Sequence, residues 1–329
     1  MKHQTKIAVI GGGAWATALA LVSLRGGNRT CLWSRNESVV AEINQKRHNS
    51  LYLPNVLLDK GIEAGSDILN VLSGAGIVLL ATPAQSIGEV AGALAELVRP
   101  GTILMCCAKG IDRETGLLPS QIVAAAVTGC PVAALSGPSF ATDVARGLPT
   151  AVTIAASAMA LAIDLAARLS SSGVRCYGSD DLTGVELGGA LKNVMAIAVG
   201  AARGLELGAS AEAALIARGF AELSRLAVAM GAKSQTLAGL SGLGDLVLTC
   251  SSLQSRNFAY GKALAHGNLA AGMALAEGRF TAAIARKLAQ KHGVDTPIID
   301  SVSDIVEGKI TARQAVMKLM ERPLRSETA

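Results

Sequence analysis

Lys192 is the residue whose surroundings most favour acid–base chemistry. It stands in the apolar segment 184–200, where Glu186 is the only other charged residue. Six positions place these two side chains about 120° apart around a helix, so they do not form an i,i+4 pair. Burial and nearby cations such as Lys109 would both lower the pKa of Lys192, as a general base requires. The alternative is a lysine whose amine extends to solvent.

Polar residues also follow two expected strands. Lys109 belongs to an AKGI motif just past the strand expected at 102–106, and Gly137 and Ser139 belong to a GPSFA motif just past that at 132–135. In open α/β sheets, ligands bind outside the carboxyl ends of the strands. Lys109 is therefore a candidate ligand-binding residue, with an ordinary exposed lysine as the alternative. GPSFA taken alone also fits a simple turn.

A third polar group lies around position 250. Asp245 follows two glycines, and Ser255, Arg256 and Asn257 are consecutive. Asp245 taken alone also fits a helix N-cap. A hydroxyl, a guanidinium and an amide within three residues are a set suited to gripping a phosphate. Each of these segments remains ambiguous when it is considered separately.

The N-terminal segment predicts a dinucleotide-binding site. Residues 7–19 have the pattern of a strand, a glycine turn and a helix, in which Gly11 permits the tight turn and Gly13 lets the backbone approach a pyrophosphate. Ala16 takes the place of a third glycine. The N–H groups and dipole at the start of the helix then favour the phosphates. A glycine turn without a ligand is the alternative, and the position between strand and helix argues against it.

Arg35 bears on which nucleotide binds. It follows the strand expected at 30–33, where an acidic residue would bind the ribose hydroxyls of NAD. The arginine fork suits the 2′-phosphate of NADP instead. We therefore expect NADP(H) and/or NAD(H), with NADP(H) favoured. A solvated loop arginine is the alternative, and Glu37 nearby would dilute the preference.

Two different domains are expected to position these residues. Strand-like runs alternate with helical patterns up to residue 179, which predicts a Rossmann-like α/β dinucleotide-binding domain at 1–179 with a mainly parallel sheet. An all-α substrate-binding and catalytic domain is expected at 180–329. The expected strands are 6–10, 30–33, 77–81, 102–106, 132–135, 151–155 and 174–177. The expected helices after residue 179 are 182–202, 211–230, 264–277, 281–293 and 311–320.

Composition argues against several other classes of protein. Aromatic residues make up 3% of the chain, which argues against a stacking surface for single-stranded nucleic acid. The net charge of +5 comes from scattered Lys and Arg, so no polybasic arm is expected. The six cysteines form no CxxC and the four histidines do not pair with them at zinc spacing, so we expect reduced thiols and no metal. No signal peptide or membrane span is expected, and we expect a cytoplasmic protein.

Together these motifs resemble one family. GGGAWATA, AKGI, GPSFA, LKN and GLGDLVLTCSSLQSRN, in this order and spacing, are similar to motifs of the bacterial NAD(P)+-dependent glycerol-3-phosphate dehydrogenase family, over nearly the whole chain. The resemblance implies reversible hydride transfer between dihydroxyacetone phosphate and sn-glycerol 3-phosphate, which feeds phospholipid synthesis. It also fits a homodimer.

The resemblance implies roles for individual residues, with Lys192 as the proton acceptor. The implied substrate-binding residues are Lys109, Gly137, Ser139, Lys192, Asp245, Ser255, Arg256 and Asn257. The cofactor-binding residues implied by the glycine turn and the resemblance are Gly11, Gly13, Ala14, Trp15, Arg35, Tyr52, Lys109, Ala141, Arg256, Leu275 and Glu277. The stretch from Arg256 to Glu277 is several residues shorter than is usual in the family.

Two alternative functions are considered. Another two-domain dehydrogenase, acting on a hydroxy acid or sugar acid, would share the glycine turn but need not have the Ser-Arg-Asn cluster. A non-enzymatic NADP-binding sensor would have no reason to keep Lys109, Lys192 and Asp245 together, and all three are present.

Overall fold

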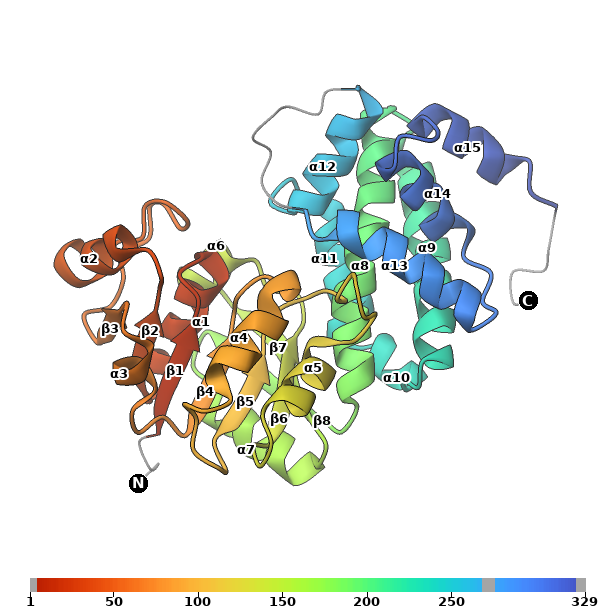
Figure 1. The fold of residues 1–329 in the computed structure, drawn as a ribbon. Helices are drawn as coiled ribbons and strands as arrows, with labels where there is room; N and C mark the ends of the chain where they lie inside the picture. The colour runs from red at the N-terminus through yellow and green to blue at the C-terminus, as the bar shows by residue number, and fades with distance from the viewer. Residues whose placement is uncertain (1–4, 268–275, 324–329) are drawn as a thin grey trace. The chain divides into compact units, whose positions relative to one another are not determined.

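The structure, a computed structural model, describes residues 5–267 and 276–323 (Figure 1). Its contacts divide the chain into two compact units. Unit 1 contains Met1–Gly189 and Gly231–Asp245, and unit 2 contains Ala190–Met230 and Leu246–Ala329. The first division falls within helix α8 (Leu182–Gly204), which begins in unit 1 and continues into unit 2.

Unit 1 is built on a sheet of eight strands within the described residues, in the order β3-β2-β1-β4-β5-β6-β7-β8. Every neighbouring pair is parallel except β6 with β7, which is antiparallel. The expectation of a mainly parallel α/β domain is confirmed. The strands are β1 Lys6–Ile10, β2 Arg29–Trp33, β3 Ile62–Gly65, β4 Ile77–Leu80, β5 Ile103–Cys106, β6 Val132–Ser136, β7 Thr150–Ala156 and β8 Val174–Ser179.

The sheet of unit 1 is covered on both faces. Along β1, Ile7 and Val9 pack into one apolar cluster with residues of α1 and α7, whereas Ala8 and Ile10 pack into another with residues of α4 and α5. This alternation is the period of two that a strand imposes. Figure 1 shows α4 and α5 in front of the sheet. The helices are α1 Ala14–Arg25, α2 Glu37–Lys46, α3 Ile68–Leu72, α4 Ile87–Leu94, α5 Pro119–Ala126, α6 Ala141–Ala145, α7 Met159–Leu169 and α10 Ser234–Leu237, with a 3-10 turn η1 at Ala84–Ser86 and a π-helical turn η2 at Leu240–Gly244.

Strand β3 was not expected from the sequence. Its four residues, Ile62–Gly65, include one buried side chain, that of Ile62. The strand lies at the edge of the sheet and pairs only with β2 in the given strand order. A short edge strand of this kind needs no apolar run or alternation, so the pattern that revealed the other strands was missing.

Unit 2 is helical, and its described residues contain no strand. The expected helix at 264–277 is wrong in its described residues after Ala265, because α12 ends at Ala265 with a turn at 266–267 and residues 276–277 precede α13. Residues 268–275 lie outside the described residues. Helix α14 was not expected, although Pro297 at its first position suits a helix start. The helices after α8 are α9 Ala209–Ala229, α11 Asp245–Ser251, α12 Arg256–Ala265, α13 Gly278–Lys291, α14 Pro297–Val306 and α15 Ala312–Met320.

Helix α8 is long and apolar enough, by length and composition, to cross a membrane. However, 94% of its apolar window is buried inside the protein. A buried core helix has the same length and composition, so α8 is weak evidence for a membrane span.

Candidate active site

The glycine turn that follows β1 has an open side. Gly11 has φ +134°, a conformation that favours glycine, and a Cβ there would lie 2.9 Å from the carbonyl oxygen of Ala81. Gly13 precedes α1 and provides no side-chain cap. A Cβ built on Gly13 would meet no heavy atom of the described residues within 4 Å. An uncapped helix N-terminus beside this open space fits a phosphate group.

The other expected cofactor residues of unit 1 lie on segments that follow strands or helices. Trp15 donates from Nε1 to the carbonyl oxygen of Cys107 at 3.1 Å, which ties the start of α1 to the segment after β5. Arg35 is exposed just after β2, as an arginine that reads a 2′-phosphate must be. Tyr52 is 46% exposed on the loop after α2. Ala141 is the first residue of α6.

Lys109 brings three of the motifs together within unit 1. Its Nζ donates to Asp245 Oδ2 at 2.7 Å and to the carbonyl oxygen of Gly137 at 2.9 Å. Ser139 Oγ donates to the same carbonyl at 2.9 Å. Asp245 is buried, and the side chain of Lys109 is 18% exposed. These bonds use two of the three N–H donors of the ammonium, so the third can polarise a substrate oxygen.

Glycines let the segments around Asp245 approach one another. A Cβ on Gly189 would collide with Ser136 Oγ, and one on Gly188 would lie 2.6 Å from the carbonyl oxygen of Ser241. Gly242 has equally little space, because its Cβ would overlap the carbonyl of Leu237. The first part of α8 and the GLG turn can therefore pack closely, just before Asp245, the first residue of α11.

Lys192 and Thr249 form a second cluster, in unit 2. Lys192 is 6% exposed, and its Nζ donates to Thr249 Oγ1 at 2.7 Å. The amine therefore does not extend to solvent, which decides against that alternative. Thr249 stands four positions after Asp245 on α11 and was not identified from the sequence. Its spacing, one helical turn from an identified residue, was the signal available.

Asn257 joins two segments of unit 2. Its Nδ2 donates to Asn193 Oδ1 at 2.9 Å, and its Oδ1 accepts from the N–H of Gly278 at 2.9 Å. Asn193, next to Lys192, was not identified as a site residue either. Both ends of the Asn257 amide thus bond within the protein, which holds the residue after Glu277 against α8.

Ser255 and Arg256 lie at the start of α12. Ser255 Oγ accepts from the N–H of Phe258 at 3.2 Å, so its hydroxyl caps the helix. Arg256 is exposed as the first helical residue. A guanidinium beside a helix N-terminus is a suitable anion site. Of the two remaining expected cofactor residues, Glu277 precedes α13, and Leu275 lies outside the described residues.

Glu186 bonds to none of the residues that contact Lys109 or Lys192 in the bonds described above. Its carboxylate accepts from the N–H of Ser120 at 2.9 Å and from Ser120 Oγ, at the start of α5. Burial raises the pKa of Glu186 to about 7, although both bonds from Ser120 act in the opposite direction. This carboxyl group therefore titrates near neutral pH without belonging to the expected site.

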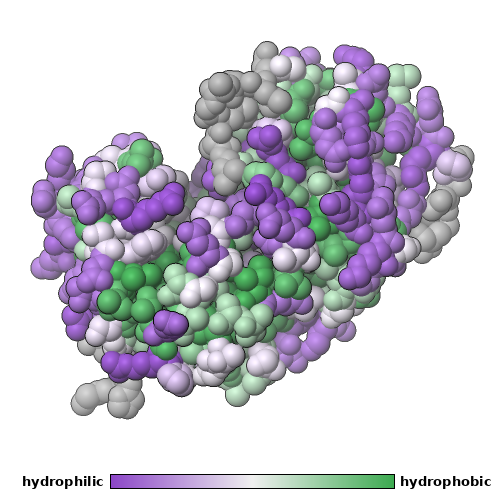
Figure 2. All heavy atoms as spheres, in the orientation of Figure 1, coloured by the Kyte–Doolittle hydropathy of each residue, from purple (hydrophilic) through white to green (hydrophobic). Residues whose placement is uncertain are grey.

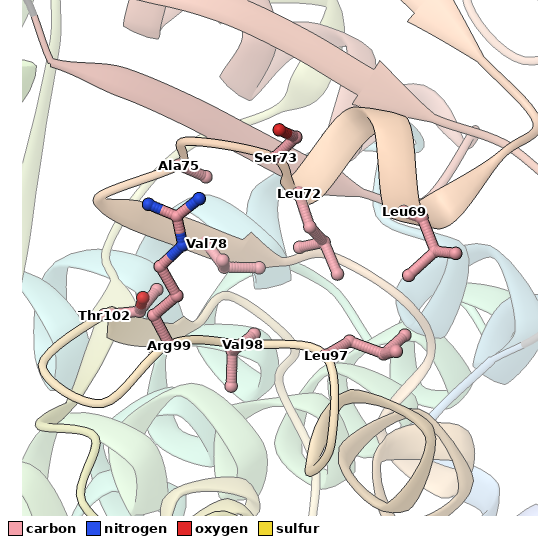
Figure 3. A pocket seen from close by; sticks show the side chains of 9 residues that line it. All are labelled: Leu69, Leu72, Ser73, Ala75, Val78, Leu97, Val98, Arg99 and Thr102. Atoms are coloured by element: carbon pink, nitrogen blue, oxygen red, sulfur yellow. The ribbon is translucent and has the colours of Figure 1, made fainter.

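A hollow of about 100 Å³ lies near the amino ends of strands β4 and β5 (Figure 3). Its lining includes Ala75 and Thr102, which precede β4 and β5, and the side chain of Arg99. Figure 2 shows apolar surface over the α3–α5 side of unit 1. Since the glycine turn follows the carboxyl end of β1, this hollow is not part of the nucleotide-binding edge.

Comparisons with known proteins cover both units. A family model described as NAD-dependent glycerol-3-phosphate dehydrogenase N-terminus matches residues 6–162, and the corresponding C-terminus model matches residues 181–317. A Mesorhizobium japonicum protein named "Glycerol-3-phosphate dehydrogenase [NAD(P)+]" is 57% identical over 99% of this chain and 95% of its own. A Chelativorans protein of the same name is 53% identical over 99% of this chain and its whole length.

A solved structure agrees with these sequence relatives. The crystal structure of a glycerol-3-phosphate dehydrogenase from Coxiella burnetii has a TM-score of 0.90 and 39% identity, covering 97% of this chain and 99% of that one. The α/β domain followed by a helical domain is therefore confirmed as an arrangement that the chain shares with a solved relative.

Proposed function

Because the chain belongs to the NAD-dependent glycerol-3-phosphate dehydrogenase family, we propose that it interconverts dihydroxyacetone phosphate and sn-glycerol 3-phosphate with Lys192 as general acid and base. It is an NAD(P)-dependent oxidoreductase. The observation that carries the proposed role of Lys192 is its buried amine, bonded to the hydroxyl of Thr249.

The hydroxyl of Thr249 suits a lysine that changes its protonation state. A hydroxyl accepts a hydrogen bond from an ammonium, and it can donate one to the lone pair of a neutral amine. The side chain of Lys192 can therefore keep one orientation before and after proton transfer. Fixed orientation of the group that transfers the proton is a large part of general acid–base catalysis.

When bound at the proposed cofactor site, NADPH or NADH would supply the hydride that reduces C2 of dihydroxyacetone phosphate. Lys192 in its ammonium form gives a proton to the C2 oxygen, so that the ketone becomes an alcohol. In the opposite direction, the neutral amine of Lys192 removes the hydroxyl proton. Lys109, held by Asp245 and Gly137, polarises the same oxygen with its remaining N–H.

Arg256 and Asn257 form the proposed phosphate grip. Arg256 offers its guanidinium at the start of α12, and Asn257 fixes the neighbouring backbone through Asn193 and Gly278. Binding the phosphate at a point remote from C2 positions the reacting carbon and raises the rate of transfer. Gly137, Ser139, Asp245 and Ser255 complete the proposed substrate site.

The proposal extends to the cofactor and to the protein as a whole. Gly11, Gly13, Ala14, Trp15 and Arg35 bind the dinucleotide together with Tyr52, Lys109, Ala141, Arg256, Leu275 and Glu277, and Arg35 favours NADP(H). Residues 1–179 serve as the dinucleotide-binding domain and 180–329 as the substrate-binding and catalytic domain. The protein acts in the cytoplasm as a homodimer and supplies sn-glycerol 3-phosphate to phospholipid synthesis.

The test is to mix the protein with NADPH and dihydroxyacetone phosphate and to follow the loss of reduced-nicotinamide absorbance. Unphosphorylated dihydroxyacetone is the control substrate. The proposal requires rapid loss with the phosphorylated substrate and a much higher KM without the phosphate. If the absorbance did not fall even at high enzyme concentration, a non-enzymatic sensor would be favoured. Equal use of the phosphorylated and unphosphorylated substrates would rule out the proposed phosphate grip.

A further inference from the structure

Asn49 is a buried residue, outside the family motifs considered above, that contacts the glycine turn. Its side chain is fully buried. Its Nδ2 donates to the carbonyl oxygen of Gly12 at 2.9 Å and to Thr17 Oγ1 at 2.8 Å. Thr17 Oγ1 in turn donates to the carbonyl oxygen of Gly13 at 3.0 Å. One side-chain amide therefore supports two consecutive carbonyl groups of the turn, one directly and one through a hydroxyl.

The direction of these carbonyls sets the direction of the next N–H groups. In a planar trans peptide, the N–H points opposite to the C=O. Holding the carbonyls of Gly12 and Gly13 towards Asn49 and Thr17 therefore turns the N–H groups of Gly13 and Ala14 away from them. Those two donors stand at the N-terminus of α1, beside the open side of Gly13. The oxygens of a pyrophosphate would accept hydrogen bonds from these two N–H groups.

The orientation of the Asn49 amide follows from its two acceptors. Its Oδ1 is buried and accepts no hydrogen bond in the described part of the chain. Turning the amide over would place that oxygen against the carbonyl of Gly12, which is also an acceptor. The amide keeps its NH2 on the turn, and a carboxylate at this position would repel the Gly12 carbonyl.

The backbone of Asn49 also organises the loop that follows α2. Its carbonyl oxygen accepts from the N–H of Leu53 at 2.8 Å and of Tyr52 at 3.3 Å. Leu53 is buried, whereas Leu51 is 62% and Tyr52 46% exposed. The same residue thus connects the glycine turn to the loop that presents Tyr52, one of the proposed cofactor contacts.

We propose that Asn49 is a positioning residue for the dinucleotide: it aims the N–H groups of Gly13 and Ala14 at the pyrophosphate and holds the Tyr52 loop beside the turn. This role rests on the proposed cofactor site. Asn49 itself does not contact the cofactor, so its removal should weaken nucleotide binding more than it changes the chemical step.

Asn28 provides a matched control within unit 1. It is also buried, at 5% exposure, and its Nδ2 also donates to two carbonyl oxygens, of Ser23 at 3.0 Å and Arg168 at 2.9 Å. It lies directly before β2, at the amino end of a strand parallel to β1, whereas the glycine turn follows the carboxyl end of β1. Asn28→Ala therefore removes equivalent bonds without touching the turn.

The experiment measures the Kd of NADPH by its fluorescence on binding, together with Tm and the KM for each substrate. Asn49→Ala should raise the Kd of NADPH by about tenfold. This is the effect expected when two hydrogen bonds to the pyrophosphate are weakened because the amide no longer orients their donors. The KM for dihydroxyacetone phosphate and the kcat at saturating NADPH should change by less than about threefold. Asn28→Ala should lower Tm and leave the Kd of NADPH unchanged.

Thr17 gives a second test if Asn49→Ala folds poorly. Thr17→Val removes the hydroxyl and should raise the Kd of NADPH, whereas Thr17→Ser keeps it and should restore the wild-type Kd. A Kd within about twofold of wild type in both folded Asn49→Ala and Thr17→Val would overturn the proposal. So would an equal rise in Asn28→Ala. Failure of the wild-type protein to bind NADPH would instead refute the proposed cofactor site itself, and the role of Asn49 with it.

Discussion

Each of the two lysines of the proposed site donates a hydrogen bond to a different kind of side-chain oxygen. Lys109, in unit 1, forms an ion pair with the buried carboxylate of Asp245 at 2.7 Å. Lys192, in unit 2, donates to the hydroxyl of Thr249 at the same distance. A carboxylate stabilises only the ammonium form, whereas a hydroxyl can bond to ammonium and amine alike. The bond to Thr249 therefore suits Lys192 for proton exchange, and the bonds of Lys109 to Asp245 and Gly137 suit it for orienting a substrate oxygen.

Replacing Lys192 should have the largest effect on activity. Lys192→Ala removes the group that exchanges a proton with C2–OH, and loss of such a group costs about 10²–10⁴-fold in kcat. The Kd of NADPH, measured by fluorescence, should remain near wild type. A kcat within about tenfold of wild type would show that another group transfers the proton.

Breaking the ion pair should affect stability as well as activity. Asp245→Asn leaves the Lys109 ammonium without its carboxylate, and loss of one partner of a buried pair costs about 3–5 kcal/mol. Because the side chain of Lys109 is 18% exposed, we expect about 3 kcal/mol or less, measured by urea unfolding. The kcat/KM should fall with it.

The corresponding change at Lys192 should be milder. Thr249→Val removes one hydroxyl of neutral charge, so we expect a fall of about tenfold in kcat and a loss of roughly 1 kcal/mol or less in stability. Thr249→Ser should retain most of the activity. If Thr249→Val proved as damaging to stability as Asp245→Asn, the distinction between the bond to a carboxylate and the bond to a hydroxyl would fail.

Glu186 should have the smallest effect on activity, but it bears on how a pH profile is interpreted. Its pKa in the folded protein is about 7, above the ordinary value of 4.5, because it is buried. The folded state therefore holds the proton more tightly than the unfolded state. Its contribution to stability is fully present below pH 4.5 and is lost as pH rises through 7.

Glu186→Gln can accept from the N–H of Ser120 at Oε1 and donate from Nε2 to Ser120 Oγ, and it does not titrate. Its unfolding free energy should depend less on pH than that of wild type between about pH 4.5 and 7. The pH profile of kcat should keep its shape if Lys192 is the titrating group. Glu222→Gln is a matched control in unit 2, since Glu222 is bonded to the start of α14 and burial raises its pKa to about 7 as well. A changed kcat profile in Glu186→Gln alone would assign that titration to Glu186.

Local patterns were sufficient to predict much of the fold. Buried strands such as Ile77–Leu80 are apolar at every position, and the glycine turn combines a special backbone conformation with a strand before it and a helix after it. Edge strand β3, which has one buried side chain, was missed, and so were helices α11, α12 and α14. Residue types and motif order were enough to identify Lys109, Lys192 and Asp245 as candidates.

The residues that contact one another in the site are far apart in the sequence, so no local pattern could reveal which of them pair. Lys109 and Asp245 are 136 positions apart, and Asn49 reaches Gly12 across 37 positions. The pairing of Lys192 with Thr249, 57 positions away, was likewise invisible in the sequence. The residue types indicated which chemistry the chain could perform, and only the fold showed which of these groups contact one another.

Rescue of the lysine variants by a small amine tests the difference between the two lysines most directly. The kcat of Lys192→Ala and of Lys109→Ala would be measured with increasing ethylamine at several pH values. The account predicts that ethylamine restores proton transfer in Lys192→Ala, with a rate that depends on the protonation of the amine, and that Lys109→Ala gains little. Rescue of Lys109→Ala with the same pH dependence, without rescue of Lys192→Ala, would contradict it.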